Sequence, residues 1–193
     1  MGVGVASGCA GETTQALPRF DIQGTIMHEY QGITELADIS SAIIVATPTG
    51  KLTSKPLPPV PGSEGTPAPV QYVLMKVDAV ISGALADVRT DGLIEVVSPG
   101  TDLNTGRLAM QQGGPYLLFV TPAMLAPGNA FGGYVVSGGP NGVFVRTDSR
   151  TPDSYYSAYH EHNKTLPEVL TVGRSTIPPI THSEAELIKI GPQ

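Results

Sequence analysis

Short apolar runs separated by glycine and proline are the feature that most limits what this chain can fold into. The clearest example is residues 116–120 (YLLFV), which lie between GGP and TP. A globular helix is usually longer than such a run, whereas a strand covered on both faces has this length and these boundaries. The chain is therefore expected to consist mainly of short strands joined by turns.

Two further runs, residues 134–136 and 143–147, flank a glycine-rich connection at 137–142 (SGGPNG). The Asn-Gly pair suits the positive φ angles of a tight turn, and β-branched or aromatic residues lie on both sides. We expect a hairpin; the alternative is a flexible loop near a ligand. The glycines match neither GxxxxGK[ST] nor GxGxxG, so they do not indicate a phosphate-binding loop.

The composition favours the same fold class. Glycine (23) and proline (18) are frequent, charged residues make up 15%, and tryptophan is absent. Frequent glycine and proline beside many β-branched residues favour strands and turns over long helices. We predict a mainly β fold, namely a small closed or partly open Greek-key barrel with one or two short helices.

The charge and hydropathy patterns exclude two classes. The net charge is −6, and the 11 Lys and Arg residues are scattered along the chain. Nucleic-acid binding requires a clustered basic surface, so no nucleic-acid partner is expected. There is no window of about 18 apolar residues, so no segment is expected to span a bilayer.

Several other segments have the pattern of strands. Residues 20–26 alternate between apolar and polar, and residues 42–47 and 93–97 are apolar runs. Residues 70–81 are the longest candidate, and a strand of this length can serve both halves of a small barrel. Its apolar face consists of Val73, Met75, Val77, Ala79 and Ile81.

Two long connections and three candidate segments for short helices complete the pattern. Residues 48–69 are too rich in proline for a sheet interior and are expected to form an exposed loop, or alternatively a polyproline ligand for a partner. Residues 98–115 are expected to be a second loop. The candidate segments for the one or two expected helices are residues 34–40, 153–162 and 183–190.

These segments predict three parts of the chain. Residues 1–18 are interpreted as a leader remnant and tether, residues 19–150 as the barrel, and residues 151–193 as a C-terminal extension packed on the barrel. No repeat of fixed period is present.

Cys9 is the single cysteine, so no internal disulfide is possible. Its context, Ala-Ser-Gly-Cys, resembles the lipobox of bacterial lipoproteins, in which the cysteine is acylated. A leucine is more usual at Ala6, and the residues before Cys9 lack the basic stretch of a full signal. The alternative is an ordinary exposed thiol.

Five segments in order resemble a group of secreted bacterial proteins, common in actinobacteria, often described as hypothetical lipoproteins. They are TELADISSAIIVAT, YVLMKVDAVISGAL, LIEVVSPG, GGPYLLFVTP and YVVSGGPNGVFVRTD, within residues 33–148. The resemblance implies an OB-like barrel of the netrin or metalloproteinase-inhibitor type, a fold that hosts binding more often than catalysis. Ser82 stands where the group usually has lysine, and residues 48–69 are a long insertion. The disulfide-dependent inhibitory mechanism of such inhibitors does not carry over to a chain with Cys9 alone.

Candidate chemistry is sparse. His160 and His162 without a third nearby ligand make a weak metal site, so no metal and no cofactor are expected. There is no GxSxG motif to indicate a nucleophile. Tyr155, Tyr156, Tyr159 and His160 are interpreted either as a surface for a partner or as the segment that packs the tail onto the barrel.

We therefore expect a non-enzymatic lipoprotein of the cell envelope, outside the cytoplasm and held at a membrane only by acyl chains on Cys9. It would act as a binding module for another envelope or surface protein. One alternative is a protein inhibitor or a phage-type surface exclusion factor, whose loops at 48–69 and 98–115 plug a site on another protein. A second alternative is an unrecognised metal-dependent hydrolase.

Overall fold

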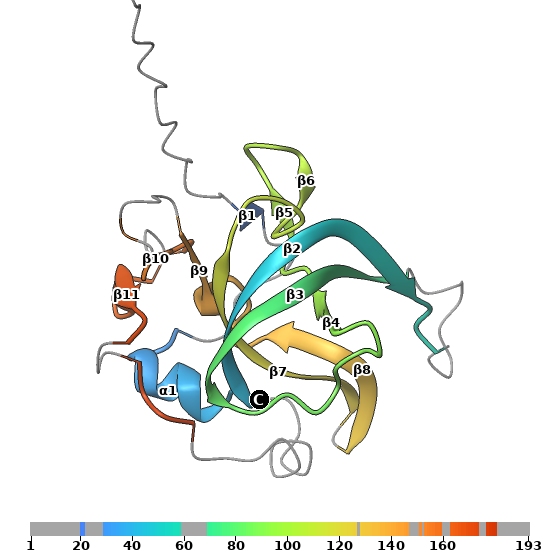
Figure 1. The fold of residues 1–193 in the computed structure, drawn as a ribbon, viewed down its shortest axis with the longest axis horizontal. Helices are drawn as coiled ribbons and strands as arrows, with labels where there is room; N and C mark the ends of the chain where they lie inside the picture. Colours follow the sequence, from blue (N-terminus) through green and yellow to red (C-terminus); the bar gives the residue numbers. More distant parts are fainter. Residues whose placement is uncertain are drawn as a thin grey trace, which may run out of the picture.

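The computed structural model describes residues 20–21, 29–58, 69–126, 128–146, 151, 153–159, 163–173 and 177–180. The described part is mainly β, as predicted (Figure 1). Its elements are β1 (Phe20–Asp21), α1 (Ile33–Asp38), β2 (Ala42–Lys55), β3 (Val70–Gly83), β4 (Leu93–Val97), β5 (Thr101–Asp102), β6 (Arg107–Leu108), β7 (Tyr116–Ala126), β8 (Asn129–Val136), the 3-10 turn η1 (Gly139–Gly142), β9 (Val143–Val145), β10 (Ser154–Ser157) and β11 (Val169–Thr171).

The main sheet closes on itself. Its strand order is β11-β10-β9-β7-β2-β3-β4-β8, and β8 also pairs with β7. The strands β2, β3, β4, β8 and β7 therefore form a ring, in which only the β4–β8 pair is parallel. Because β7 returns beside β2 after three consecutive neighbouring strands, the order is that of a Greek key. The predicted fold class, a small partly open barrel, is confirmed.

The barrel interior is filled by alternate side chains of the ring strands. Val73 and Met75 of β3 are fully buried and meet Ile94 and Val96 of β4 and Tyr134 of β8. Residues between these inward positions point to the outer face of the sheet. The interior of the barrel is therefore a packed core and not a channel.

The predicted apolar face of β3 is only partly buried. Ala79 is exposed, although Val73 and Met75 are buried. One reason is that the register with β2 shifts between Val77 and Ala79, which sets Ala79 opposite Val45 of the outer core. In addition, β4 pairs with β3 only over residues 72–76.

The expected loop at residues 48–69 begins later than predicted, because β2 continues through Pro48 to Lys55. Neighbouring β7 pairs with β2 only from Ala42 to Ala46, whereas β3 pairs along the whole length of β2. Proline lacks an N–H and is tolerated where a strand has a free edge. Pro48 lies just beyond the last residue that β7 pairs with, so it removes no bond to β7.

The expected hairpin between residues 134–136 and 143–147 is wrong. Both β8 and β9 pair with the same edge of β7, with Val136 opposite Val120 and Val143 opposite Leu118. The glycine-rich residues 137–142 are thus an insertion opposite a single β7 residue, Phe119, whose carbonyl accepts the Ser137 N–H at 2.8 Å. The long edge of β7 holds both segments, and this prevents them from pairing with each other.

The tail extends the sheet beyond the barrel. The helix predicted at 153–162 is wrong over its described part, because β10 pairs with β9 on one side and with β11 on the other. The expected C-terminal extension from residue 151 therefore contributes strands to the main sheet.

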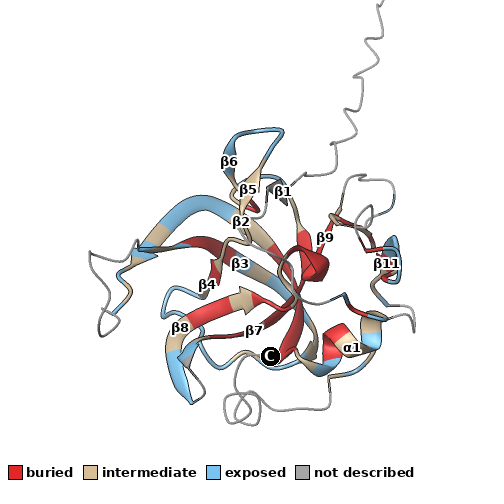
Figure 2. Ribbon diagram, turned by 180° about the vertical axis from the view of Figure 1, so that it is seen from behind, coloured by how far each residue is buried: buried red, intermediate tan, exposed pale blue. Residues whose placement is uncertain are grey.

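A second core lies on the outer face of the sheet, between β2, β7 and β9 and the layer formed by α1 and the tail (Figure 2). The rings of Phe119 and Phe144 are 6.0 Å apart in it. Leu36 of α1 and Leu170 of β11 are buried against them. Helix α1 (Ile33–Asp38) corresponds to the candidate helix at residues 34–40; it begins one residue earlier and ends two residues earlier than expected.

One end of the barrel is covered by residues 98–115, which were expected to be a loop. They contain a short hairpin of β5 and β6, to which β1 adds. Directly after β6, Ala109 and Met110 are buried in the barrel interior. Met110 has a positive φ of 62°, which is uncommon for a residue other than glycine. The hairpin is therefore anchored by side chains that close the barrel end.

The closure of the ring predicts a specific sensitivity at Gly133, where φ is +72° and a Cβ would lie 2.7 Å from the Glu95 carbonyl oxygen. Gly50 has a similar φ of +77° with nothing within 4 Å of an added Cβ. We expect Gly133→Ala to lower the free energy of unfolding by roughly 3 kcal/mol or more, because strain and overlap add. Gly50→Ala should cost only about 1 kcal/mol. Urea unfolding followed by circular dichroism measures both, and equal losses would contradict this account of the closure.

Candidate functional site

The residues singled out from the sequence are not brought together. Cys9, His160 and His162 lie outside the described residues. Tyr155 is 3% exposed and packs in the outer core, as the packing interpretation predicts for that residue. Tyr156 and Tyr159 are half-buried, so for them a role in partner binding stays a prediction.

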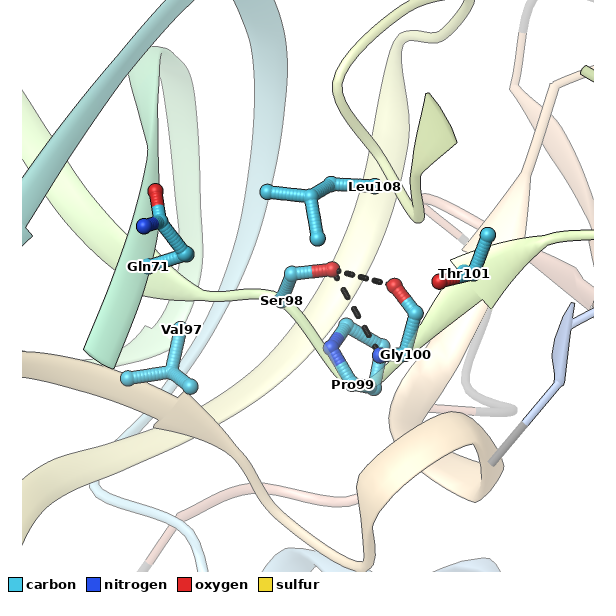
Figure 3. A pocket seen from close by; sticks show the side chains of 7 residues that line it. All are labelled: Gln71, Val97, Ser98, Pro99, Gly100, Thr101 and Leu108. Carbon is cyan, nitrogen blue, oxygen red and sulfur yellow. Dashed lines mark hydrogen bonds between the residues drawn. The ribbon is translucent and has the colours of Figure 1, made fainter. Parts of the chain in front are cut away.

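A different feature stands out, a hollow of about 320 Å³ at the hairpin-covered end of the barrel. The ends of β3 and β4 form one side and the β5–β6 hairpin forms the other (Figure 3). All of the lining residues are uncharged: Gln71, Val97, Ser98, Pro99, Gly100, Thr101 and Leu108. Its volume lies at the lower end of the range for small-molecule sites, about 300–1,000 Å³.

Ser98 fixes the floor of the hollow. Its hydroxyl lies within donating distance of two carbonyl oxygens, those of Gly100 at 2.8 Å and Ala109 at 3.0 Å. The Ala109 N–H in turn donates to the Gly100 carbonyl at 2.8 Å. These bonds hold the turn after β4 against the residue that follows β6. The hollow is therefore a preformed feature of the barrel end.

The walls of the hollow offer both apolar surface and hydrogen-bonding groups. Pro99, Val97 and Leu108 provide the apolar part. In the described part of the chain, the side chains of Gln71 and Thr101 make no hydrogen bond, and Gln71 is exposed. An amide can donate and accept, and so can a hydroxyl. The hollow can therefore bind an uncharged group that combines a small apolar part with a polar one.

A charged network lies beside the hollow on the outer face of β4. The Glu95 side chain is 12% exposed and pairs with Lys55 at 2.6 Å and Arg89 at 3.1 Å. Thr53 donates to the same carboxylate at 3.0 Å. Burial alone raises the pKa of Glu95, but the hydrogen bonds from Lys55 and Thr53 outweigh burial, so the pKa lies below its ordinary value. The carboxylate is thus ionised at neutral pH and ties β2 and the 84–92 loop to β4.

Tyr72 lies under this network. Its ring is covered by the Lys55 ammonium group, 4.6 Å from the ring centroid, and its hydroxyl donates to the Gly132 carbonyl at 3.1 Å. Burial, followed by the negative charges of Glu95 and Asp87, raises the pKa of Tyr72 to about 12. Asp87 also accepts the Gly133 N–H, so the loop before β4 is held against β8.

The network is a structural tie more than a reactive centre. Three donors already occupy the two oxygens of Glu95, and the pKa of its carboxyl is lowered, so this carboxylate is poorly suited to take up a proton as a general base. Among the residues that the structure describes, no three His, Cys, Asp or Glu side chains gather as metal ligands. In the same residues, no helix has the length and apolarity needed to cross a membrane.

Comparison with known proteins gives no relative from which a function could be transferred to this chain. No family model, no curated protein and no solved structure matches this chain.

The raised pKa values of Tyr72 and Tyr116 predict how the stability of the barrel changes at high pH. The pKa of Tyr116 is also raised to about 12, by burial and then by Asp102. Both phenols should therefore ionise well above pH 10, the ordinary range of tyrosine, when absorbance at 295 nm is followed. Because the unfolded chain ionises first, near pH 10, stability should be full below pH 10 and fall as the pH rises toward 12.

Tyr116→Phe should reduce the difference in bound protons between the unfolded and folded states by about one in this pH window. Tyr156→Phe serves as the control, because its side chain is half-buried at the tail. An unchanged pH dependence for Tyr116→Phe would contradict the burial argument.

Proposed function

We propose that this chain is a non-enzymatic binding module of the cell envelope. The hollow at the end of its barrel would receive a small group presented by a loop of a protein partner. The observation that carries the proposal is the combination of apolar walls with the unpartnered side chains of Gln71 and Thr101. A few polar groups between apolar walls are the usual composition of a binding pocket.

The scaffold supports this use. The ring of β2, β3, β4, β8 and β7 is a five-stranded Greek-key barrel, an architecture that OB-type domains use for binding. Sites on rigid elements hold their geometry better than sites on loops. Gln71 and Val97 lie on strands whose pairing continues into the buried core. The partner-contacting groups are therefore held in place before binding.

The chemistry of the lining selects the kind of group that binds. Since every lining residue is uncharged, the hollow offers no counterion for a phosphate, a carboxylate or an ammonium group. A buried charge without a counterion is strongly unfavourable. A partner loop that presents a small apolar side chain beside a backbone amide matches both the walls and the free polar groups. The expected partner is another envelope or surface protein.

The test is capture of a partner that depends on the hollow. Immobilised full-length protein should retain a partner from envelope extracts of its source, and Thr101→Arg should abolish retention by filling the hollow with a charged side chain. Thr90→Arg is the matched control, because Thr90 is exposed in the loop before β4. Thermal unfolding verifies that both variants fold. Equal retention by both variants would refute the proposed site.

A second candidate function, inhibition of a partner protein, is favoured by the β5–β6 hairpin. Leu103 follows β5 and is 59% exposed, the largest exposure among the exposed large apolar side chains of the described residues. The turn around it is ordered, since the Asp102 carbonyl accepts the N–H of Gly106 at 2.7 Å. A pre-ordered apolar tip can plug an apolar site at low entropic cost. If the captured partner is an enzyme, loss of its inhibition by Leu103→Glu distinguishes this function from simple binding.

The envelope location of this module is proposed from Cys9 and its lipobox-like context. Two acyl chains give stable membrane attachment, whereas one chain gives marginal attachment. Produced with its own leader, the protein should partition into the detergent phase, and Cys9→Ser should move it to the aqueous phase. The hollow should bind its partner equally in both forms. Unchanged partitioning of Cys9→Ser would contradict the lipid anchor without affecting the proposed binding site.

A further inference from the structure

The long strand β2 leaves the barrel with one edge uncovered. On the side of β7 its pairing stops at Ala46, while on the side of β3 it continues to Lys55. Over residues 47–55 the described structure contains no backbone bond to a strand on the β7 side. The side chains of Thr47 and Thr49 bond to β3, through Asp78 at 2.6 Å and the Leu74 carbonyl at 2.9 Å. The chain therefore presents an open strand edge on a firmly held ribbon (Figure 1).

The first half of this edge is blunted. Pro48 has no N–H to donate, and the register with β3 shifts between Pro48 and Leu52, where Gly50 adopts a φ of 77°. The Lys51 N–H is directed to the Thr49 hydroxyl at 3.3 Å. Proline and bulges of this kind disfavour strand addition. The usable edge is therefore at residues 51–55, in which Leu52 to Lys55 pair with β3 without further shifts and Lys51 directly precedes them.

The side chains of this part determine which segment would fit. Thr53 and Lys55 lie on the outer face with Tyr72, while Leu52 lies on the opposite face and is 39% exposed. Lys55 is already paired with Glu95. Lys51 is exposed and forms no ion pair with any residue that the structure describes. An incoming strand thus meets one free positive charge next to an exposed aliphatic side chain.

We propose that residues 51–55 of β2 form a strand-addition site for an extended partner segment in which acidic and apolar residues alternate. Main-chain hydrogen bonds to the β2 edge supply the attachment, which is the way in which extended peptides augment sheets. An acidic residue beside Lys51 neutralises the free charge, and an apolar neighbour covers Leu52. This surface is separate from the hollow and does not depend on the proposed function.

Charge argues for a partner of different sequence over a second copy of this chain. An antiparallel pair of two β2 edges centred on Thr53 would set Lys51 of one copy opposite Lys55 of the other. Like charges directly opposite each other destabilise a strand pair. The chain itself contains no acidic residue between positions 47 and 55 to relieve this repulsion.

The test uses a defined probe, an acetylated and amidated peptide of sequence Glu-Val-Glu-Val-Glu-Val-Glu that carries a fluorophore. Anisotropy should report saturable binding of this peptide to the full-length protein. Hydrogen exchange should show new protection confined to amides of residues 51–55. Lys51→Glu should weaken binding about fivefold to tenfold, since it replaces an attraction by a repulsion. Lys164→Glu, an equal change of charge at an exposed tail position, should leave binding unchanged.

A second peptide separates strand pairing from simple charge attraction. The same sequence N-methylated at every residue keeps its charges but cannot donate to the edge, and it should not bind. Equal binding of the two peptides, or protection outside residues 51–55, would overturn the proposal. So would the absence of binding at a peptide concentration of about 1 mM, which would mean that Pro48 and the bulge close the edge. Thr101→Arg should leave peptide binding intact, so failure of the hollow and failure of the edge give different results.

Discussion

The structure depends on the burial of β7 on both of its faces and the pairing of both of its edges. Leu118 and Val120 point into the barrel, while Leu117 and Phe119 point into the outer core, and all four are fully buried. Burial of each such side chain contributes roughly 1.5–3 kcal/mol. Because β7 also bonds to β2 on one edge and to β8 and β9 on the other, it is the element through which the barrel and the tail are joined.

The two surfaces proposed for binding follow from where this central packing ends. Beyond Ala46, β2 no longer has β7 beside it, and its edge becomes available to a partner. The ladder between β4 and β3 ends at Val97, the Ser98 N–H still donates to the Gln71 carbonyl at 3.4 Å, and the chain then turns through Pro99 and Gly100 to form the hollow. Both surfaces are therefore held by a rigid ring without being part of its core. This arrangement suits a module that binds other proteins, since the groups that meet the partner are ordered in advance.

The candidate site shows which features of the molecule can be predicted from local sequence patterns and which cannot. The turn signal Ser-Pro-Gly at residues 98–100 was visible, but nothing in it indicated that Gln71 would lie across from it. The sequence left open whether Tyr155 faces a partner or packs the tail onto the barrel, and in the structure it is buried in the outer core beside Phe144 and Leu170. Residues far apart in the sequence form a site only when the sheet closes, and no local pattern encodes that closure.

The sequence by itself determined the elements: apolar runs and their alternation placed β3, β4 and the first half of β7, and glycine and proline marked their ends. These are local effects, set by backbone conformation and by which side chains can be buried. Only the tertiary structure decided that the glycine-rich residues 137–142 are an insertion opposite Phe119 and not a hairpin turn, and that Pro48 belongs to a strand. Both outcomes depend on which edges of β7 and β2 are already occupied, a property of neighbouring strands that no single segment carries.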